Sequence, residues 1–166
     1  MLARLPTLDS RSMGNHPNIC PLCMSHPESH DHIFLNCCFT SLIWRFIKDR
    51  CQFYTSITNW EELIQYISVR WKAKSVPNLL RKVCFSAMMY HTWEERNKRI
   101  FKKKKSSQKV VLARICSTIT TILMLGFLQD CSTARKILSE WNLSLSCCRP
   151  PPRPPDTTNR RLNAGA

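Results

Sequence analysis

The chain has 166 residues, 43% of them hydrophobic, which suffices for one domain or for a small domain with appendages. Only three glycines are present, and this scarcity argues against Gly-rich phosphate loops and tight β-hairpins and favours a mostly helical chain. The formal net charge of +14 favours a polyanionic partner, nucleic acid before an anionic membrane surface, the alternative being a basic protein that is merely soluble.

The first segment, residues 1–38, is rich in Pro, His, Cys and Asn and has no helical periodicity. We expect a loop that needs an external staple to become ordered. Met1–Ser12 lacks the apolar stretch of a secretory signal, which leaves an intracellular location, nuclear or cytoplasmic, as the expectation. In such a compartment, a C-x-x-C motif near a histidine is typical of a metal site rather than a disulfide.

A candidate metal motif with the spacing C-x2-C-x8-H-x4-C lies in this segment. Its residues are Cys20, Cys23, His32 and Cys37. The C-x-x-C thiolates can reach one ion from a tight turn, and three sulfurs with one nitrogen suit Zn²⁺. Four protein ligands leave no open coordination position, which predicts a structural rather than a catalytic zinc site.

Three further side chains are alternative ligands: His26, His30 and Cys38. His30 is so close to His32 in sequence that the two would not easily serve one ion. Cys38 is an alternative to Cys37, and only one of the two should bind, because a shift of one residue turns the thiol away from the ion. The remaining alternative is that these cysteines bind no metal and lie in a disordered segment.

Apolar residues at helical spacing predict two helices after this segment. The first carries Leu42, Ile43, Phe46, Ile47 and Cys51. The second follows a capping box at Thr58–Glu61 and carries Trp60, Leu63, Ile64 and Ile67.

Three more helices are predicted. The third begins near Pro77, after Ser75, and runs toward Phe101, with a buried side made of Leu79, Leu80, Val83, Cys84, Ala87 and Tyr90. The fourth is capped by Ser106 or Ser107 and carries Val110, Val111, Ile115, Ile119, Ile122 and Leu123. The fifth is capped by Ser132 and carries Ala134, Ile137, Leu138 and Trp141.

The uncharged stretch Ile115–Gln129 is shorter than the roughly 20 apolar residues of a membrane span, so no membrane partner is expected.

A basic segment joins the third and fourth helices. It contains Arg96, Lys98, Arg99, Lys102, Lys103, Lys104, Lys105 and Lys109, without an intervening acidic residue. The segment predicts a strip that contacts RNA or DNA phosphates with low sequence selectivity, beside Trp93 and Phe101, which could stack on bases. A nuclear localisation patch and a solvated hinge at 96–109 are the alternatives.

Other residues give weaker signals. Cys51, Cys84, Cys116 and Cys131 are expected in the core. Cys84 and His91 lie seven residues apart on one helix, which separates them by about 10 Å, too far for direct proton transfer. Because no paired acid and base is visible, the chain is not expected to be an enzyme. The Pro- and Arg-rich end predicts a disordered tail, with a ligand for SH3-type domains as the alternative.

These elements divide the chain into three parts: a zinc-binding module at 1–56, a helical bundle-like region at 57–145 and a disordered tail at 146–166. The fold class is therefore expected to be mostly α, with a small Cys/His loop stapled by zinc.

Several stretches together resemble a known family. They are Arg4–Asp9 (RLPTLD), Cys20–Cys23 (CPLC), Glu28–Cys37 (ESHDHIFLNC) and Trp44, with a looser match at Thr92–Phe101 (TWEERNKRIF). They resemble the reverse-transcriptase zinc-binding domain of non-LTR retrotransposon polyproteins, especially those of plants. The resemblance implies the same four ligands, a module truncated at its N-terminus, and nucleic acid or a reverse transcriptase on another chain as partner.

The resemblance does not extend the family's enzymes to this chain. No polymerase motif with paired aspartates is present, and Leu162–Ala166 only faintly resembles the first strand of a ribonuclease H domain. A zinc- and nucleic-acid-binding fragment is therefore the expected function. The alternatives are a protein-interaction module that uses the helices and the Pro-rich tail, and a decayed open reading frame.

Overall fold

The computed structural model describes residues 18–125, 128–143 and 148–149. A π-helical turn, η3 (His32–Asn36), precedes the helices α1 (Cys38–Arg50), α2 (Trp60–Arg70), α3 (Val76–Phe101), α4 (Gln108–Met124) and α5 (Ser132–Glu140). Two short strands, β1 (Leu128–Gln129) and β2 (Cys148–Arg149), pair in parallel with Leu128 opposite Cys148. The expected mostly α fold class is confirmed.

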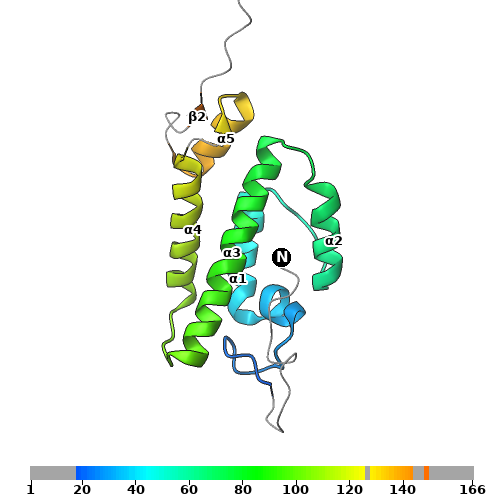
Figure 1. Ribbon diagram of the computed structural model, residues 1–166, viewed down its shortest axis with the longest axis vertical. Helices are drawn as coiled ribbons and strands as arrows, with labels where there is room; N and C mark the ends of the chain where they lie inside the picture. The colour runs from blue at the N-terminus through cyan, green and yellow to red at the C-terminus, as the bar shows by residue number, and fades with distance from the viewer. Residues whose placement is uncertain (1–17, 126–127, 144–147, 150–166) are drawn as a thin grey trace, which may run out of the picture.

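The long helix α3 is the centre of the fold (Figure 1). α4 runs back beside it, and α1 packs against both. α2 lies on the side of α3 away from α4. α5 contacts α3 at the opposite end from the Cys/His loop, which we define as residues 18–37. This arrangement places the Cys/His loop beside the C-terminal half of α3, where the basic segment begins.

One hydrophobic core joins the Cys/His loop to the helices. It includes Ile33 and Phe34 of η3 together with Ile43, Met88 and Ile119 of α1, α3 and α4. A cluster of aromatic rings fills the space between α1, α2 and α3, and in it Phe85 lies 6.0 Å from Trp44 and 6.2 Å from Trp60. The core is continuous across the boundary predicted at 56/57.

The predicted helix caps are only partly correct. Ser107 caps α4 as expected, and its hydroxyl oxygen accepts a hydrogen bond from Val110 N. α2 is capped by Asn59 rather than Thr58, because the extended backbone of Asn59 aims its carboxamide oxygen at Glu62 N. α5 is capped one residue before Ser132, by Cys131, whose extended backbone brings Sγ to Ala134 N.

Some predicted core positions are at the surface. Tyr90 is 64% exposed, because the buried side of α3 passes through Ala87, Met88 and His91 instead. Cys51 and Cys84 are buried as expected, but Cys131 is exposed at the start of α5.

The two ends of the chain differ from the expectation in different ways. Segment 1–38 is not wholly loop-like, since residues 30–36 are helical. The tail at 146–166 lies outside the described residues, apart from Cys148–Arg149 in β2. Within the part of the chain that is described, no helix combines the length and the apolar character that a membrane crossing requires.

Candidate metal centre

A tight loop presents the first two cysteines. Antiparallel pairing of Ile19 with Pro27 closes the base of the loop, and Cys20 N donates to His26 O at 2.8 Å. Met24 N donates to Cys20 O at 2.8 Å, and Met24 adopts a left-handed φ of 59° as the chain turns back. The C-x-x-C spacing therefore brings both thiols to one side of a single turn.

The π-helical turn η3 presents the other two ligands. His32 N donates to the hydroxyl of Ser29 at 3.0 Å, which fixes the start of the turn. Cys37 N donates to His32 O at 2.6 Å, the longer reach that defines a π-helical turn. Cys37 is also the residue before α1, so the H-x4-C spacing ends where the helix begins.

The four predicted ligands converge. Their ligand atoms lie within 4.8 Å of one another, with Cys20 Sγ 3.9 Å from Cys37 Sγ and Cys23 Sγ 3.2 Å from His32 Nε2. A disulfide would bring the two sulfurs to about 2.05 Å, so the 3.9 Å separation is that of free thiols. Cys20 and Cys37 are fully buried, and the group has the size and donors to hold a metal ion.

The environment of the buried sulfurs favours a thiolate. The hydrogen bond with Cys37, together with the backbone N–H groups of Cys23 and Leu22, lowers the pKa of Cys20 to about 5 against the opposing effect of burial. The same hydrogen bond and burial raise the pKa of Cys37. Cys20 is therefore the sulfur of the pair that ionises first, and the thiolate is the form in which cysteine binds a metal.

The alternative ligands lie outside this group. The ring of His26 is exposed, 5.4 Å from that of His32. His30 stacks against Phe34 and Trp60, with ring centroids 6.3 and 6.1 Å away. The thiol of Cys38 is exposed on the first turn of α1. Among the described residues, the group that could hold a metal ion contains none of these three.

Two arginines of the predicted basic strip instead fasten the loop to α3. Arg96 makes two hydrogen bonds to the buried carboxylate of Glu28, at 2.8 and 3.3 Å. Arg99 Nη1 donates to Leu22 O at 2.7 Å and to Pro21 O at 3.1 Å. Both guanidinium groups are engaged inside the fold, so Arg96 and Arg99 do not belong to an exposed phosphate-contact strip.

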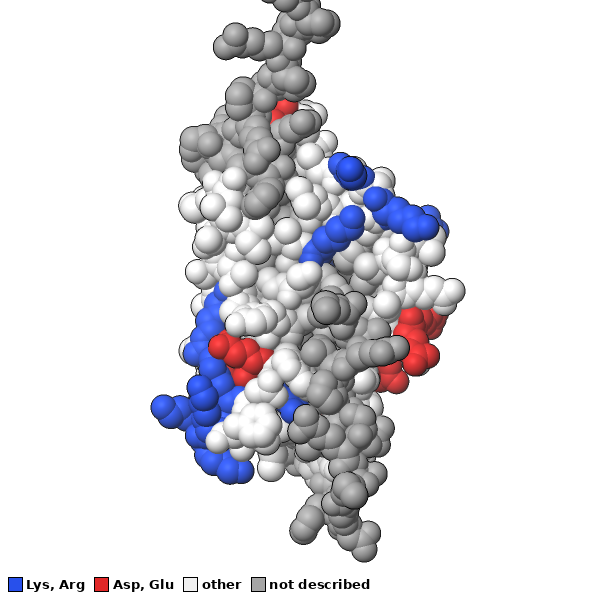
Figure 2. All heavy atoms as spheres, viewed as in Figure 1, with Lys and Arg blue, Asp and Glu red and all other residues white. Residues whose placement is uncertain are grey.

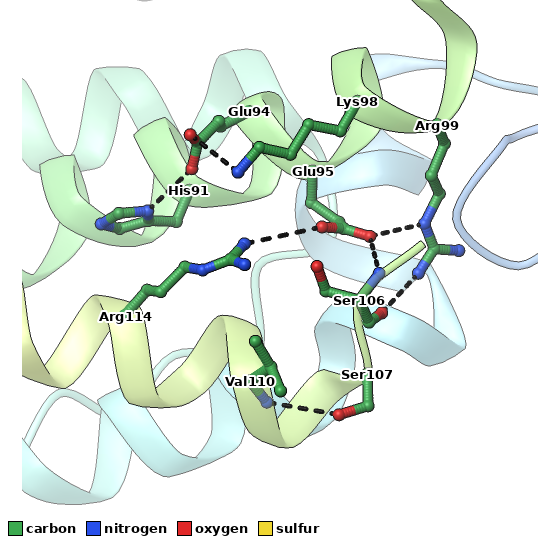
Figure 3. Close-up of polar contacts among 9 residues, drawn as sticks. All are labelled: His91, Glu94, Glu95, Lys98, Arg99, Ser106, Ser107, Val110 and Arg114. Carbon is green, nitrogen blue, oxygen red and sulfur yellow. Dashed lines mark hydrogen bonds and ion pairs between the residues drawn. The ribbon is translucent and has the colours of Figure 1, made fainter. Parts of the chain in front are cut away.

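The buried carboxylate of Glu95 anchors the connection between α3 and α4 (Figure 3). Its Oε1 accepts from Arg99 Nε at 2.9 Å and from Ser106 N at 2.7 Å, and Arg114 of α4 lies 3.9 Å from Oε2. Arg99 Nη2 also donates to Ser106 O at 3.0 Å. These contacts fix both ends of the loop that carries the lysines.

The lysines themselves are at the surface. Lys102, Lys103, Lys104 and Lys105 are exposed in the connection, and Lys109 is exposed on the first turn of α4. Figure 2 shows basic side chains gathered at this end of the molecule. Lys98 pairs with Glu94 at 2.9 Å and is partly covered. The exposed remainder of the predicted strip is the lysine loop, which we define as residues 102–105.

The motif spacing predicted which four residues converge, but nothing in it predicted the roles of Glu28 and Glu95. A signal for Glu28 was present, because Glu28 and Arg96 lie in two of the stretches that carry the family resemblance. Comparisons with protein-family models, with curated proteins and with solved structures find no match to this chain.

Proposed function

We propose that the chain is a non-catalytic nucleic-acid-binding module whose N-terminal loop is held by one structural Zn²⁺. The convergence of Cys20, Cys23, His32 and Cys37 within 4.8 Å carries the proposal. In the role implied by the reverse-transcriptase resemblance, the module binds RNA or DNA beside a polymerase on another chain.

The geometry of the ligand group supports zinc. Zn–S bonds of about 2.3 Å and Zn–N bonds of about 2.0 Å in a tetrahedron put ligand sulfurs about 3.8 Å apart, and sulfur about 3.6 Å from nitrogen. The corresponding separations are 3.9 Å for Cys20 and Cys37 and 3.2 Å for Cys23 and His32. Three thiolates and an imidazole are the donors that zinc prefers, and four protein ligands make the site structural.

Metal analysis tests the zinc assignment. The purified chain is expected to contain about one zinc, and Cys23→Ser to lose most of it because one of four bonds is removed. Cys38→Ser is the matched control, since Cys38 is exposed and outside the ligand group, and it should keep its zinc. Absence of zinc from the parent chain, or full zinc in Cys23→Ser, would overturn the assignment.

Charge and exposure support the nucleic-acid partner. The chain carries a net charge of +14, and the lysine loop concentrates four cations in consecutive exposed positions. Lysines at such positions neutralise phosphates and release counterions, which gives affinity without base recognition. Binding is therefore expected to be strong at low salt and to weaken steeply as salt rises.

A pair of double variants tests whether the lysine loop is the contact. Lys104→Met/Lys105→Met should weaken binding to RNA and lower the slope of log K against log salt by about 1.4 to 1.8, the loss of two phosphate contacts. Lys72→Met/Lys74→Met removes the same charge from exposed positions between α2 and α3, and it should leave the slope nearly unchanged. Equal effects of the two variants would mean diffuse attraction, and no binding at low salt would refute the function.

A further inference from the structure

An aromatic groove lies along α3 next to the lysine loop. Its volume is about 320 Å³, and its lining includes Tyr90, Trp93 and Phe101 with Asn97, Lys98 and Lys102. Tyr90 is 64% exposed and Phe101 is 68% exposed. Large aromatic rings left in water beside cations mark an interaction surface rather than a core.

The spacing of the rings suits a linear ligand. Tyr90 and Phe101 are eleven residues apart on one helix, a rise of about 16 Å. Stacked nucleotides advance about 3.4 Å each, so this length corresponds to about five nucleotides. That number lies within the roughly 4–16 nucleotides that single-strand-binding domains cover.

The ring of Trp93, in the middle of the groove, is held in place by packing against residues of the fold. The guanidinium of Arg96 lies 4.6 Å from the centroid of Trp93, and Phe34 of η3 lies 6.5 Å away. Arg96 is in turn bound to Glu28 of the Cys/His loop. Trp93 therefore keeps its orientation without a ligand, which reduces the entropy lost on binding.

The charges around the groove favour an anionic ligand. The one acidic residue in its lining, Glu94, is already paired with Lys98 at 2.9 Å and with His91 at 3.3 Å (Figure 3). Lys102 is exposed at the end of the groove, and the rest of the lysine loop follows. A phosphate backbone can thus lie over these lysines while its bases face the rings.

We propose that this groove binds the unpaired bases of single-stranded nucleic acid by stacking, a proposal that deepens the nucleic-acid function and rests on it. Tyr90 and Phe101 stack on bases, and Lys102 with the lysine loop holds the backbone. A duplex offers phosphates to the lysines but keeps its base faces covered, so the groove selects single strands.

Fluorescence anisotropy with a labelled single-stranded RNA and a matched duplex tests the groove. Phe101→Ala and Tyr90→Ala should each weaken single-strand binding between about five- and 150-fold, the effect of losing one stacked base, and leave duplex binding unchanged. The salt dependence should not change, because no cation is removed. Tyr54→Ala is the control, since Tyr54 is 72% exposed on the connection between α1 and α2 and lies outside the groove.

The outcomes separate the two proposals. Equal affinity for single strand and duplex, with no effect of Phe101→Ala or Tyr90→Ala but a clear effect of Lys104→Met/Lys105→Met, overturns the groove and leaves the nucleic-acid function intact. Absence of binding to both nucleic acids at low salt overturns both. Circular dichroism of each variant checks that the helices are retained; both substituted rings are mostly exposed, so folding should not depend on them.

Discussion

Glu95 is a fully buried carboxylate on which several cationic and N–H groups converge. Burial alone would raise the pKa of Glu95, but the hydrogen bonds from Ser106 N and from Arg99 outweigh it and lower the pKa below its usual value of 4.5. Arg114 of α4 also faces the carboxylate. The ionised form is therefore the one that the fold stabilises.

The lowered pKa predicts a pH-dependent contribution to stability. A group whose pKa is lower in the folded state stabilises the fold above its ordinary pKa and loses that effect as pH falls through the lowered value. Glu95→Gln should reduce the free energy of unfolding by about 2–3 kcal/mol at pH 7, the usual cost of breaking a buried charged hydrogen-bond network. The difference between parent and variant should shrink as pH falls below 4.5.

Urea unfolding of both proteins across this pH range measures the effect. Protonation of other groups, the Cys/His group included, acts on parent and variant alike, so only their difference reports on Glu95. Glu94→Gln is the neighbouring control on α3, and it should cost less than about 1 kcal/mol because the pair with Lys98 is partly exposed. A difference for Glu95→Gln that stays constant from pH 7 to pH 3 would contradict the prediction.

Sequence spacing located the Cys/His group because its four residues are close in the chain and their chemistry is unusual. It misassigned Arg96 and Arg99 for the opposite reason. Arg96 pairs with Glu28 across 68 residues, and Arg99 reaches Leu22 across 77. A local run of basic residues shows charge but not its distant partners, so buried and exposed cations look alike in the sequence.

At the scale of helices, apolar periodicity was a reliable guide because each helix buries one stripe against the core. Caps were less reliable, since several polar residues compete for each helix start and the backbone conformation decides among them. At α2 the competitors are Thr58 and Asn59, both exposed. Periodicity was also less reliable for the burial of single residues, as Tyr90 shows. A shift of one position around the helix is enough to move a side chain from the core to the surface.

The cap of α2 can be tested by removing each competitor. Asn59→Ala should lower the free energy of unfolding by about 1 kcal/mol, because Glu62 N loses its side-chain acceptor. Thr58→Ala should cost much less, since its hydroxyl is not the cap. Chemical denaturation of the two variants measures the difference. A larger loss for Thr58→Ala would restore the capping box expected from the sequence.

At the scale of the whole molecule, the Cys/His loop and the helices depend on one another. Their apolar residues form one core, Glu28 and Arg96 pair across the junction, and Arg99 donates to two carbonyls of the loop. Composition did not indicate this coupling, because its change near residue 39 suggested separate parts. Composition reports local propensity, whereas the shared core results from tertiary packing.

The shared core predicts that metal removal weakens the whole fold rather than the loop alone. A chelator should remove the stabilisation that four metal–ligand bonds provide. A decrease in the free energy of unfolding of even about 3 kcal/mol lowers the melting temperature of a chain this size by about 10 °C. Hydrogen exchange gives the sharper test. The amide of Ile119, fully buried on α4, should lose protection together with that of Ile33 beside the Cys/His group, because opening one side of the core exposes the other. If chelation removes the protection of the Ile33 amide but leaves the Ile119 amide protected, the metal stabilises an independent module and the core does not unfold cooperatively.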